Sequence, residues 1–186
     1  MFNVIQYFED SIVVTSLWLQ STEPENFSKF CAQVNATLKS GNKIMIFGNG
    51  GSSSEASHIA AEFVGKCVVD SGALPAICLN DSTAAITAIA NDWGYDFIFS
   101  RQLEAYAKKD DLVIGLSTSG DSANVLNGLR KAKQIGCITS LWTSQRYKRE
   151  IEDFSFIFKA PTNSTPRAQE LHLQMGHALA EYVESN

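Results

Sequence analysis

Apolar residues recur along the chain with two different periods, which predict helices and strands in turn. Helical spacing dominates residues 3–20 and 25–40, on either side of the polar run STEPEN, so we expect two N-terminal helices. Five short, continuous apolar runs follow, and such runs are typical of strands buried on both faces. We expect these strands at KIMIFG (43–48), LPAICL (74–79), DLVIGLS (111–117), CITSLWT (137–143) and FSFIFKA (154–160).

Helical patterns fill the intervals between these runs. We expect further helices at 52–66, 82–90, 95–108, 121–134 and from about 166 to 183. Alternating strands and helices indicate an α/β fold, a doubly wound five-stranded parallel sheet of flavodoxin-like architecture. No internal repeat interrupts it, so residues 1–186 are expected to form a single domain with an N-terminal helical segment over 1–40. Ligands of such sheets bind at the carboxyl ends of the strands.

Two glycine- and serine-rich turns follow the first and third predicted strands. The second turn, within GLSTSGDSANV (115–125), offers the free backbone N–H groups of a helix start. Its hydroxyl groups belong to Ser117, Thr118, Ser119 and Ser122. One hydroxyl would be enough to cap the helix, so four of them indicate a phosphate monoester site. The first turn, GNGGS (48–52), lacks the GxGxxG spacing of a dinucleotide site and alone is equally consistent with a plain strand-to-helix turn.

Histidines and carboxylates supply candidate chemistry on two predicted helices. His58 and Glu62 share a helix face because they are four residues apart. This spacing suits two ligands of one divalent metal, an acid and a base around one substrate, or a surface pair. The last helix adds Gln169, His172 and His177, and we expect His172 to be structural. About 12 Å of helix rise separates Gln169 from His177, so either Gln169 reaches in from the helix start or different subunits supply the two.

Composition narrows the range of functions. A formal net charge of -5 argues against a sequence-independent nucleic-acid binder, because such proteins neutralise phosphates with Lys and Arg. No apolar run approaches the roughly 18 residues of a membrane span, and the start MFNVIQYFED lacks the basic region of a signal peptide. The four cysteines form no CxxC pair, as in proteins with reduced core thiols. We therefore expect a cytoplasmic protein that binds neither nucleic acid nor membrane.

Five segments within residues 40–184 carry a resemblance to a known family. They are GNGGSSSEASHIAAEFVG, LPAICL, TAIANDWGYDFIFSRQLEA, DLVIGLSTSGDSANVL and RAQELHLQMGHALAE. Together they resemble the bacterial phosphoheptose isomerases of the sugar isomerase (SIS) domain superfamily, which convert sedoheptulose 7-phosphate to D-glycero-D-manno-heptose 7-phosphate. The resemblance implies an SIS fold, a homotetramer built around the N-terminal helices, and a divalent metal, usually zinc.

The same resemblance implies roles for particular side chains. Glu62 would be the base of an aldose–ketose isomerisation through an enediol, and His177 the general acid or the last metal ligand. The metal ligands would be His58, Glu62, Gln169 and His177. The substrate contacts would come from Asn49, Gly50, Gly51, Glu62, Asn91, Asp92, Ser117, Thr118, Ser119, Ser122 and Gln169.

The chain departs from the family pattern at three points. Glu55 stands where relatives often have Asp, Pro166 stands where they have Thr or Asp, and TSQRYKREIED (143–153) lacks their glycine loop. Two alternatives to this isomerase are a non-catalytic SIS-domain regulator that binds the bacterial replication initiator, and an isomerase of another sugar phosphate. Glu62 and His177 favour an enzyme, since a scaffold needs neither.

Assembly is predicted from the N-terminal helices. Large apolar residues there, among them Trp18, Phe27 and Phe30, exceed what a small five-stranded domain is expected to bury. Exposed apolar helix faces usually mark an oligomer interface. Together with the separation of Gln169 from His177, this predicts a homotetramer whose active sites borrow residues across subunits, with Glu62 and His177 coming from different chains.

Overall fold

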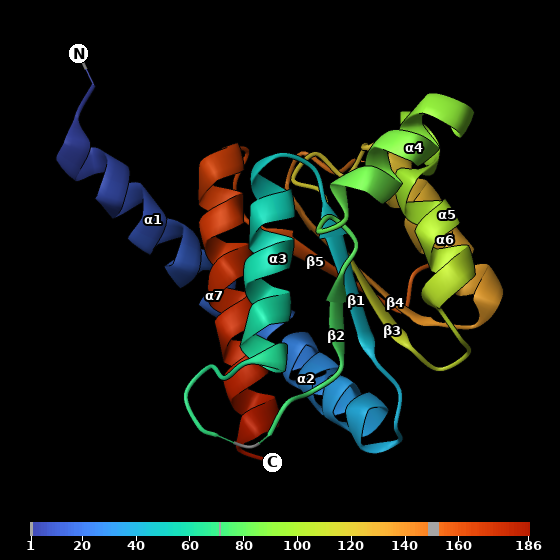
Figure 1. The fold of residues 1–186 in the computed structure, drawn as a ribbon. Coiled ribbons are helices and arrows are strands. Elements are labelled where there is room, and N and C mark those ends of the chain that lie inside the picture. The colour runs from blue at the N-terminus through green and yellow to red at the C-terminus, as the bar shows by residue number, and fades with distance from the viewer. Residues whose placement is uncertain (1, 71, 149–152) are drawn as a thin grey trace.

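The computed structural model describes residues 2–70, 72–148 and 153–186, and within them one parallel sheet lies between two layers of helices (Figure 1). The strand order is β2-β1-β3-β4-β5. The strands are β1 (Ile44–Gly48), β2 (Ala76–Cys78), β3 (Leu112–Leu116), β4 (Ile138–Ser144) and β5 (Phe156–Ala160). The predicted doubly wound, five-stranded α/β fold is confirmed.

The helices lie close to their predicted positions. They are α1 (Val4–Leu19), α2 (Glu23–Lys39), α3 (Gly51–Val64), α4 (Thr83–Trp93), α5 (Ile98–Tyr106), α6 (Ala123–Ile135) and α7 (Thr165–Glu184). One prediction differs, because residues 95–97 form a 3₁₀ turn before α5 instead of the first turn of one long helix. Gly94, with a φ of 98°, ends α4 and redirects the chain there. Pro166 lies in the first turn of α7, where its missing N–H costs no helical hydrogen bond.

Each face of the sheet has its own apolar core. Helices α2, α3 and α7 cover one face, with Phe30, Phe63 and Trp142 in the core beneath them. Helices α5 and α6 cover the other face around Phe47 and Phe99, whose rings stack at 4.5 Å. The register pairs Ile44 with Leu112 and runs to Gly48 opposite Leu116. The glycine turn after β1 and the serine turn after β3 are therefore neighbours at one edge of the sheet.

Helices α3 and α7 lie side by side and run in the same direction (Figure 1). Their closest approach requires glycine, because a Cβ on Gly176 would lie 2.4 Å from Ile59 Cγ1. At the start of α3, a Cβ on Gly51 would lie 2.4 Å from the Gln169 amide nitrogen. The side-chain groups on facing sides of the two helices are thus brought together along most of their length.

Helix α1 projects from the body of the chain (Figure 1) and carries the exposed apolar surface. The expectation that Trp18, Phe27 and Phe30 would be exposed is wrong, since they are only 8%, 7% and 0% exposed within the chain. Phe27 and Phe30 pack against Phe158 of β5, which the helical pattern alone did not reveal. The exposed apolar residues of this region are instead Phe2, Val4, Ile5, Phe8, Ile12, Val13, Leu17 and Leu19.

All four cysteines are free thiols, as expected for reduced thiols. Among the described residues, every helix is too short or too polar to cross a bilayer.

Candidate active site

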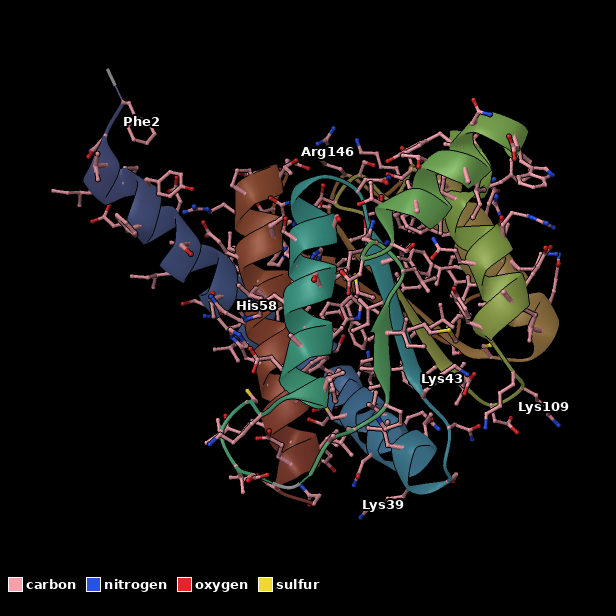
Figure 2. The ribbon with its side chains drawn as sticks, in the orientation of Figure 1. Phe2, Lys39, Lys43, His58, Lys109 and Arg146 are labelled. Carbon is pink, nitrogen blue, oxygen red and sulfur yellow. The ribbon has the colours of Figure 1, made fainter. Side chains whose placement is uncertain are left out.

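His58, Glu62 and His177 form one cluster between α3 and α7, with ligand atoms that all lie within 4.8 Å of one another. His58 Nε2 is 2.9 Å from His177 Nε2 and 3.1 Å from Glu62 Oε1. Glu62 Oε1 is 3.9 Å from His177 Nε2. Both imidazoles are about half exposed, with side-chain exposures of 47% and 45%, so the cluster is open to a small ligand. Figure 2 shows His58 on α3, the helix that lies beside α7.

The three groups come from one chain, so the prediction that Glu62 and His177 belong to different chains is wrong. The spacing argument treated α7 by itself, whereas the partner of His177 is the neighbouring helix. Gln169 belongs to the first turns of α7, and its side chain reaches the start of α3, where its amide nitrogen is 3.5 Å from Ser52 Oγ. About 9 Å of helix rise separate Ser52 from His58, so in this conformation Gln169 serves the glycine turn.

The donor set of the cluster fits a divalent cation. Two imidazole nitrogens and one carboxylate oxygen are the ligands that zinc takes in catalytic sites, which keep a position open for substrate. Without a cation, the 2.9 Å contact between the two Nε2 atoms is a hydrogen bond, in which the N–H of one ring donates to the unprotonated nitrogen of the other. The cluster can therefore hold a metal or move a proton, and both uses suit acid–base chemistry.

The serine turn brings three hydroxyls together. Ser117 Oγ lies 3.0 Å from Ser122 Oγ and 3.5 Å from Ser119 Oγ. Ser122 is the N-cap residue of α6, yet its side chain makes no capping hydrogen bond. The Ser122 hydroxyl therefore does not cap the helix but faces Ser117 in the turn. It lies next to the N-terminus of α6, which favours anions.

The glycine turn connects both sides of the site. The Asn49 side chain exchanges two 2.8 Å hydrogen bonds with Asn124 on α6, and its Oδ1 accepts a 3.0 Å hydrogen bond from the Tyr95 hydroxyl. Gly50 has a φ of 57°, a left-handed conformation that favours glycine. Sequence reasoning missed Asn124 and Tyr95, although both stand inside motif segments, because only the fold brings them to Asn49.

Asn91 and Asp92 lie on α4, a helix without a buried residue. The Asn91 amide donates a 2.8 Å hydrogen bond to Asp92 Oδ1, so the two side chains bond each other and not the glycine or serine turn. The structure thus places Gln169 and both turns at one edge of the sheet, and the cluster about two turns further along α3 and α7. Asn91 and Asp92 remain on an exposed helix.

Cys67 also lies beside the cluster, and nothing in the sequence indicated that this cysteine belongs to the site. Its Sγ lies 3.9 Å from the His177 carbonyl oxygen. Burial raises the pKa of the Cys67 thiol, and the charges of Glu62 and Glu184 raise it further. The thiol is therefore kept protonated beside the cluster.

Helices α3 and α7 each carry a buried titratable side chain, Glu55 and His172. His172 is fully buried and its Nε2 lies 2.9 Å from the Thr143 carbonyl oxygen, as expected of a structural histidine. Burial lowers the pKa of His172 to about 4. Glu55 is 8% exposed and neither carboxyl oxygen has a partner among the described residues. Burial raises the pKa of Glu55 to about 7, against a weaker opposing effect of Ser52.

Comparison with known proteins gives concordant matches over nearly the whole chain. Residues 6–144 match the family described as SIS domain. Over 180 residues the chain is 43% identical to a phosphoheptose isomerase of Thermodesulfovibrio yellowstonii, and the alignment covers 95% of this chain and 88% of that protein. It is 46% identical over 150 residues to the phosphoheptose isomerase of Helicobacter pylori, in an alignment that covers 80% of this chain and 77% of that protein. The solved phosphoheptose isomerase of Neisseria gonorrhoeae superposes with a TM-score of 0.90 at 31% identity, covering 98% and 97%.

The buried His172 predicts a specific dependence of stability on pH. The folded pKa of about 4 lies below the ordinary histidine pKa of 6.5, so the unfolded chain binds a proton first as the pH falls. The free energy of unfolding should therefore fall between pH 6.5 and 4, by about 3 kcal/mol at most from this group, and be unaffected by it above that range. We expect His172→Gln to lose less stability than the wild type over this range.

Urea denaturation at several pH values measures this difference. Between pH 7 and 8 the two proteins should show the same dependence on pH, which serves as the internal control. Parallel curves below pH 6 would contradict the assignment of a neutral, buried His172.

Proposed function

Because the chain belongs to the SIS domain family, and within it to the phosphoheptose isomerases, we propose that it interconverts sedoheptulose 7-phosphate and D-glycero-D-manno-heptose 7-phosphate in heptose biosynthesis. The resemblance read from its motifs is confirmed, and the chain is a sugar-phosphate isomerase. The observation that carries the proposed reaction is the His58–Glu62–His177 cluster between α7 and α3, the helix that starts at the glycine turn.

The isomerisation moves one proton between two carbons and one between two oxygens. In this mechanism Glu62 removes a proton from C1 of the ketose, which gives an enediol, and returns it to C2 of the aldose. His177 gives a proton to O2 as the enediol forms, and it regains one from O1 as the enediol collapses. Their carboxylate and imidazole lie 3.9 Å apart, which supports a shared task at adjacent atoms.

A divalent metal, for which zinc suits the donor set, would be held by His58 and Glu62, with His177 as the last ligand in place of its role as general acid, because the Nε2 that faces the cluster holds either a metal or a proton. Gln169, the fourth ligand that the family motif implies, would have to turn from Ser52 toward the cluster. When bound, such a metal supplies electrophilic polarisation of the substrate oxygens. The 2.9 Å approach of two imidazole nitrogens beside a carboxylate supports this role, because a cation or a proton between two nitrogen lone pairs offsets their repulsion.

The phosphate would be bound by the serine turn. Ser117, Ser119 and Ser122 direct their hydroxyls to one place, and the start of α6 favours an anion there. Thr118 completes the predicted set. Substrate contacts by Asn49, Gly50, Gly51, Gln169, Asn91 and Asp92 are carried over from the family motif.

The alternatives call for direct tests. A cluster of two histidines and a glutamate has no use in a purely regulatory SIS protein, which favours the enzyme. Incubation with sedoheptulose 7-phosphate, with products read by NMR, tests the reaction, and fructose 6-phosphate and ribulose 5-phosphate test other sugar chain lengths. A cytoplasmic location remains a prediction.

Glu62→Gln should lower turnover at least about 100-fold, because it removes the general base while keeping the shape of the side chain. Steady-state kinetics of the isomerisation measure this loss. Glu181→Gln, which changes an exposed carboxylate on α7, should keep wild-type activity. Near-wild-type turnover of Glu62→Gln would contradict the assignment of the base.

A chelator should abolish turnover and zinc should restore it.

Ser122→Ala should raise KM roughly 10- to 100-fold, since a hydrogen bond to a charged phosphate contributes about 1.5–3 kcal/mol. Its melting temperature should hardly change, because the Ser122 hydroxyl makes no capping bond. Ser164→Ala is the matched control, as Ser164 is the N-cap of α7 and also lacks a side-chain capping bond. If both variants had the same KM, the serine turn would not be the phosphate site.

The chain is further proposed to be a homotetramer that buries the exposed face of α1. Ile5, Phe8 and Ile12 are 70%, 64% and 66% exposed in the single chain, far more than isolated apolar residues require. Light scattering should give four times the chain mass for the wild type, and a smaller species for Phe8→Glu/Ile12→Glu. Lys109→Glu, far from α1 (Figure 2), should remain tetrameric. A monomeric wild type at micromolar concentration would contradict the assembly.

A further inference from the structure

The serine turn packs against a short segment that follows β4. Gly120 has a φ of 69°, and a Cβ on it would lie 2.2 Å from Cδ2 of the Tyr147 ring. Tyr147 is 4% exposed and belongs to the core cluster of α5 and α6. The ring thus fills the space directly beside the one residue of the turn that has no side chain.

A second contact ties the same two segments together. The Ser144 hydroxyl donates a 2.6 Å hydrogen bond to the Thr118 carbonyl oxygen. Ser144 also closes its own turn, because its carbonyl oxygen accepts a 3.0 Å hydrogen bond from the Tyr147 backbone N–H. The contacts at Thr118 and Gly120 lie on either side of Ser119, one of the clustered hydroxyls.

The Tyr147 ring is itself held in place. Lys159 on β5 lies with its Nζ 5.0 Å from the ring centroid, within the range of a cation–π contact. The phenol oxygen is buried and has no hydrogen-bond partner among the described residues. The ring, and not the hydroxyl, therefore makes the contact with Gly120. Tyr147 stands in the segment 143–153, where the chain departs from the family's glycine loop; of that segment, residues 149–152 lie outside the described part.

We propose that Tyr147 is a positioning residue, whose ring fixes the Gly120 backbone and so holds the hydroxyls of the serine turn in the arrangement that binds phosphate. A left-handed glycine is the point of a turn with the greatest backbone freedom. A ring packed on that glycine removes part of this freedom before the ligand arrives, which lowers the entropic cost of binding. The identity of the ligand rests on the proposed function, whereas the coupling between ring and turn does not.

Tyr147→Leu tests the coupling by removing the ring, and Tyr147→Phe removes only the hydroxyl. In the ligand-free protein, amide hydrogen exchange over residues 117–122 should be about 10-fold faster in Tyr147→Leu and unchanged in Tyr147→Phe. KM for sedoheptulose 7-phosphate should rise about 10-fold in Tyr147→Leu while kcat stays within about 2-fold, because the ring acts on phosphate binding and not on the reacting carbons. The inhibition constant of inorganic phosphate should rise in parallel.

Phe99→Leu is the matched control, because Phe99 is a fully buried ring of the same core cluster. It should lower the melting temperature comparably and leave exchange over 117–122 and KM unchanged. Gly120→Ala approaches the same contact from the other side, so it should accelerate exchange there even if Tyr147→Leu does not fold. Its effect and that of Tyr147→Leu should be non-additive in the double variant.

Exchange and KM within about 2-fold of wild type in Tyr147→Leu would overturn the proposal, as would equal effects of Tyr147→Phe and Tyr147→Leu. If the wild type fails to turn over sedoheptulose 7-phosphate, the proposed function fails. The exchange measurement then still decides the inference, since it needs no substrate.

Discussion

The close, parallel packing of α3 and α7 is the constraint on which the candidate site depends. Both helices enter from the same edge of the sheet, and the absence of a side chain at Gly176 lets Ile59 approach it closely. This approach brings His177 to His58 and Glu62, two turns below the point where Gln169 meets Gly51. A larger residue at Gly176 would separate the helices, and the three ligand atoms would no longer lie within reach of one ion or one proton.

At the C-terminal end of the same helix pair, the Glu184 carboxylate joins α7 to the chain that follows α3. Glu184, at the end of α7, accepts hydrogen bonds from the backbone N–H groups of Cys67, Val68 and Val69, at 2.6, 2.8 and 2.9 Å. These N–H groups lower the pKa of the Glu184 carboxyl, with Val69 contributing most. The chain leaving α3 is thereby held against α7, so the cluster lies between an anchored end and the packed glycines. Such preorganisation suits a site in which proton donors and acceptors must stay within a fraction of an ångström.

Most of the fold could be predicted from the sequence because its strands are continuous apolar runs and its helices are strongly periodic. Part of the cluster could also be predicted, because His58 and Glu62 are four residues apart and therefore share a helix face whatever the tertiary structure. What could not be predicted was which surfaces meet. The rise along α7 separates Gln169 from His177, and only the neighbouring α3 explains how each has a partner in one chain. Likewise, Phe27 is buried because Trp142 and Phe158 lie opposite it, which a helical pattern cannot indicate.

The phosphate site proposed at the serine turn would explain how a protein with a formal net charge of -5 binds an anionic substrate. Hydroxyls and a helix N-terminus are neutral donors, so they attract phosphate through local dipoles without a basic surface. Neutral donors bind only when they converge, because each contributes little by itself, and convergence has to be maintained by packing. In this chain that packing comes from two sides. The Asn49–Asn124 pair joins the glycine turn to α6, and the segment after β4 supports Thr118 and Gly120 from behind. Binding strength at such a site is therefore set as much by the rigidity of the surrounding backbone as by the hydroxyls that touch the ligand.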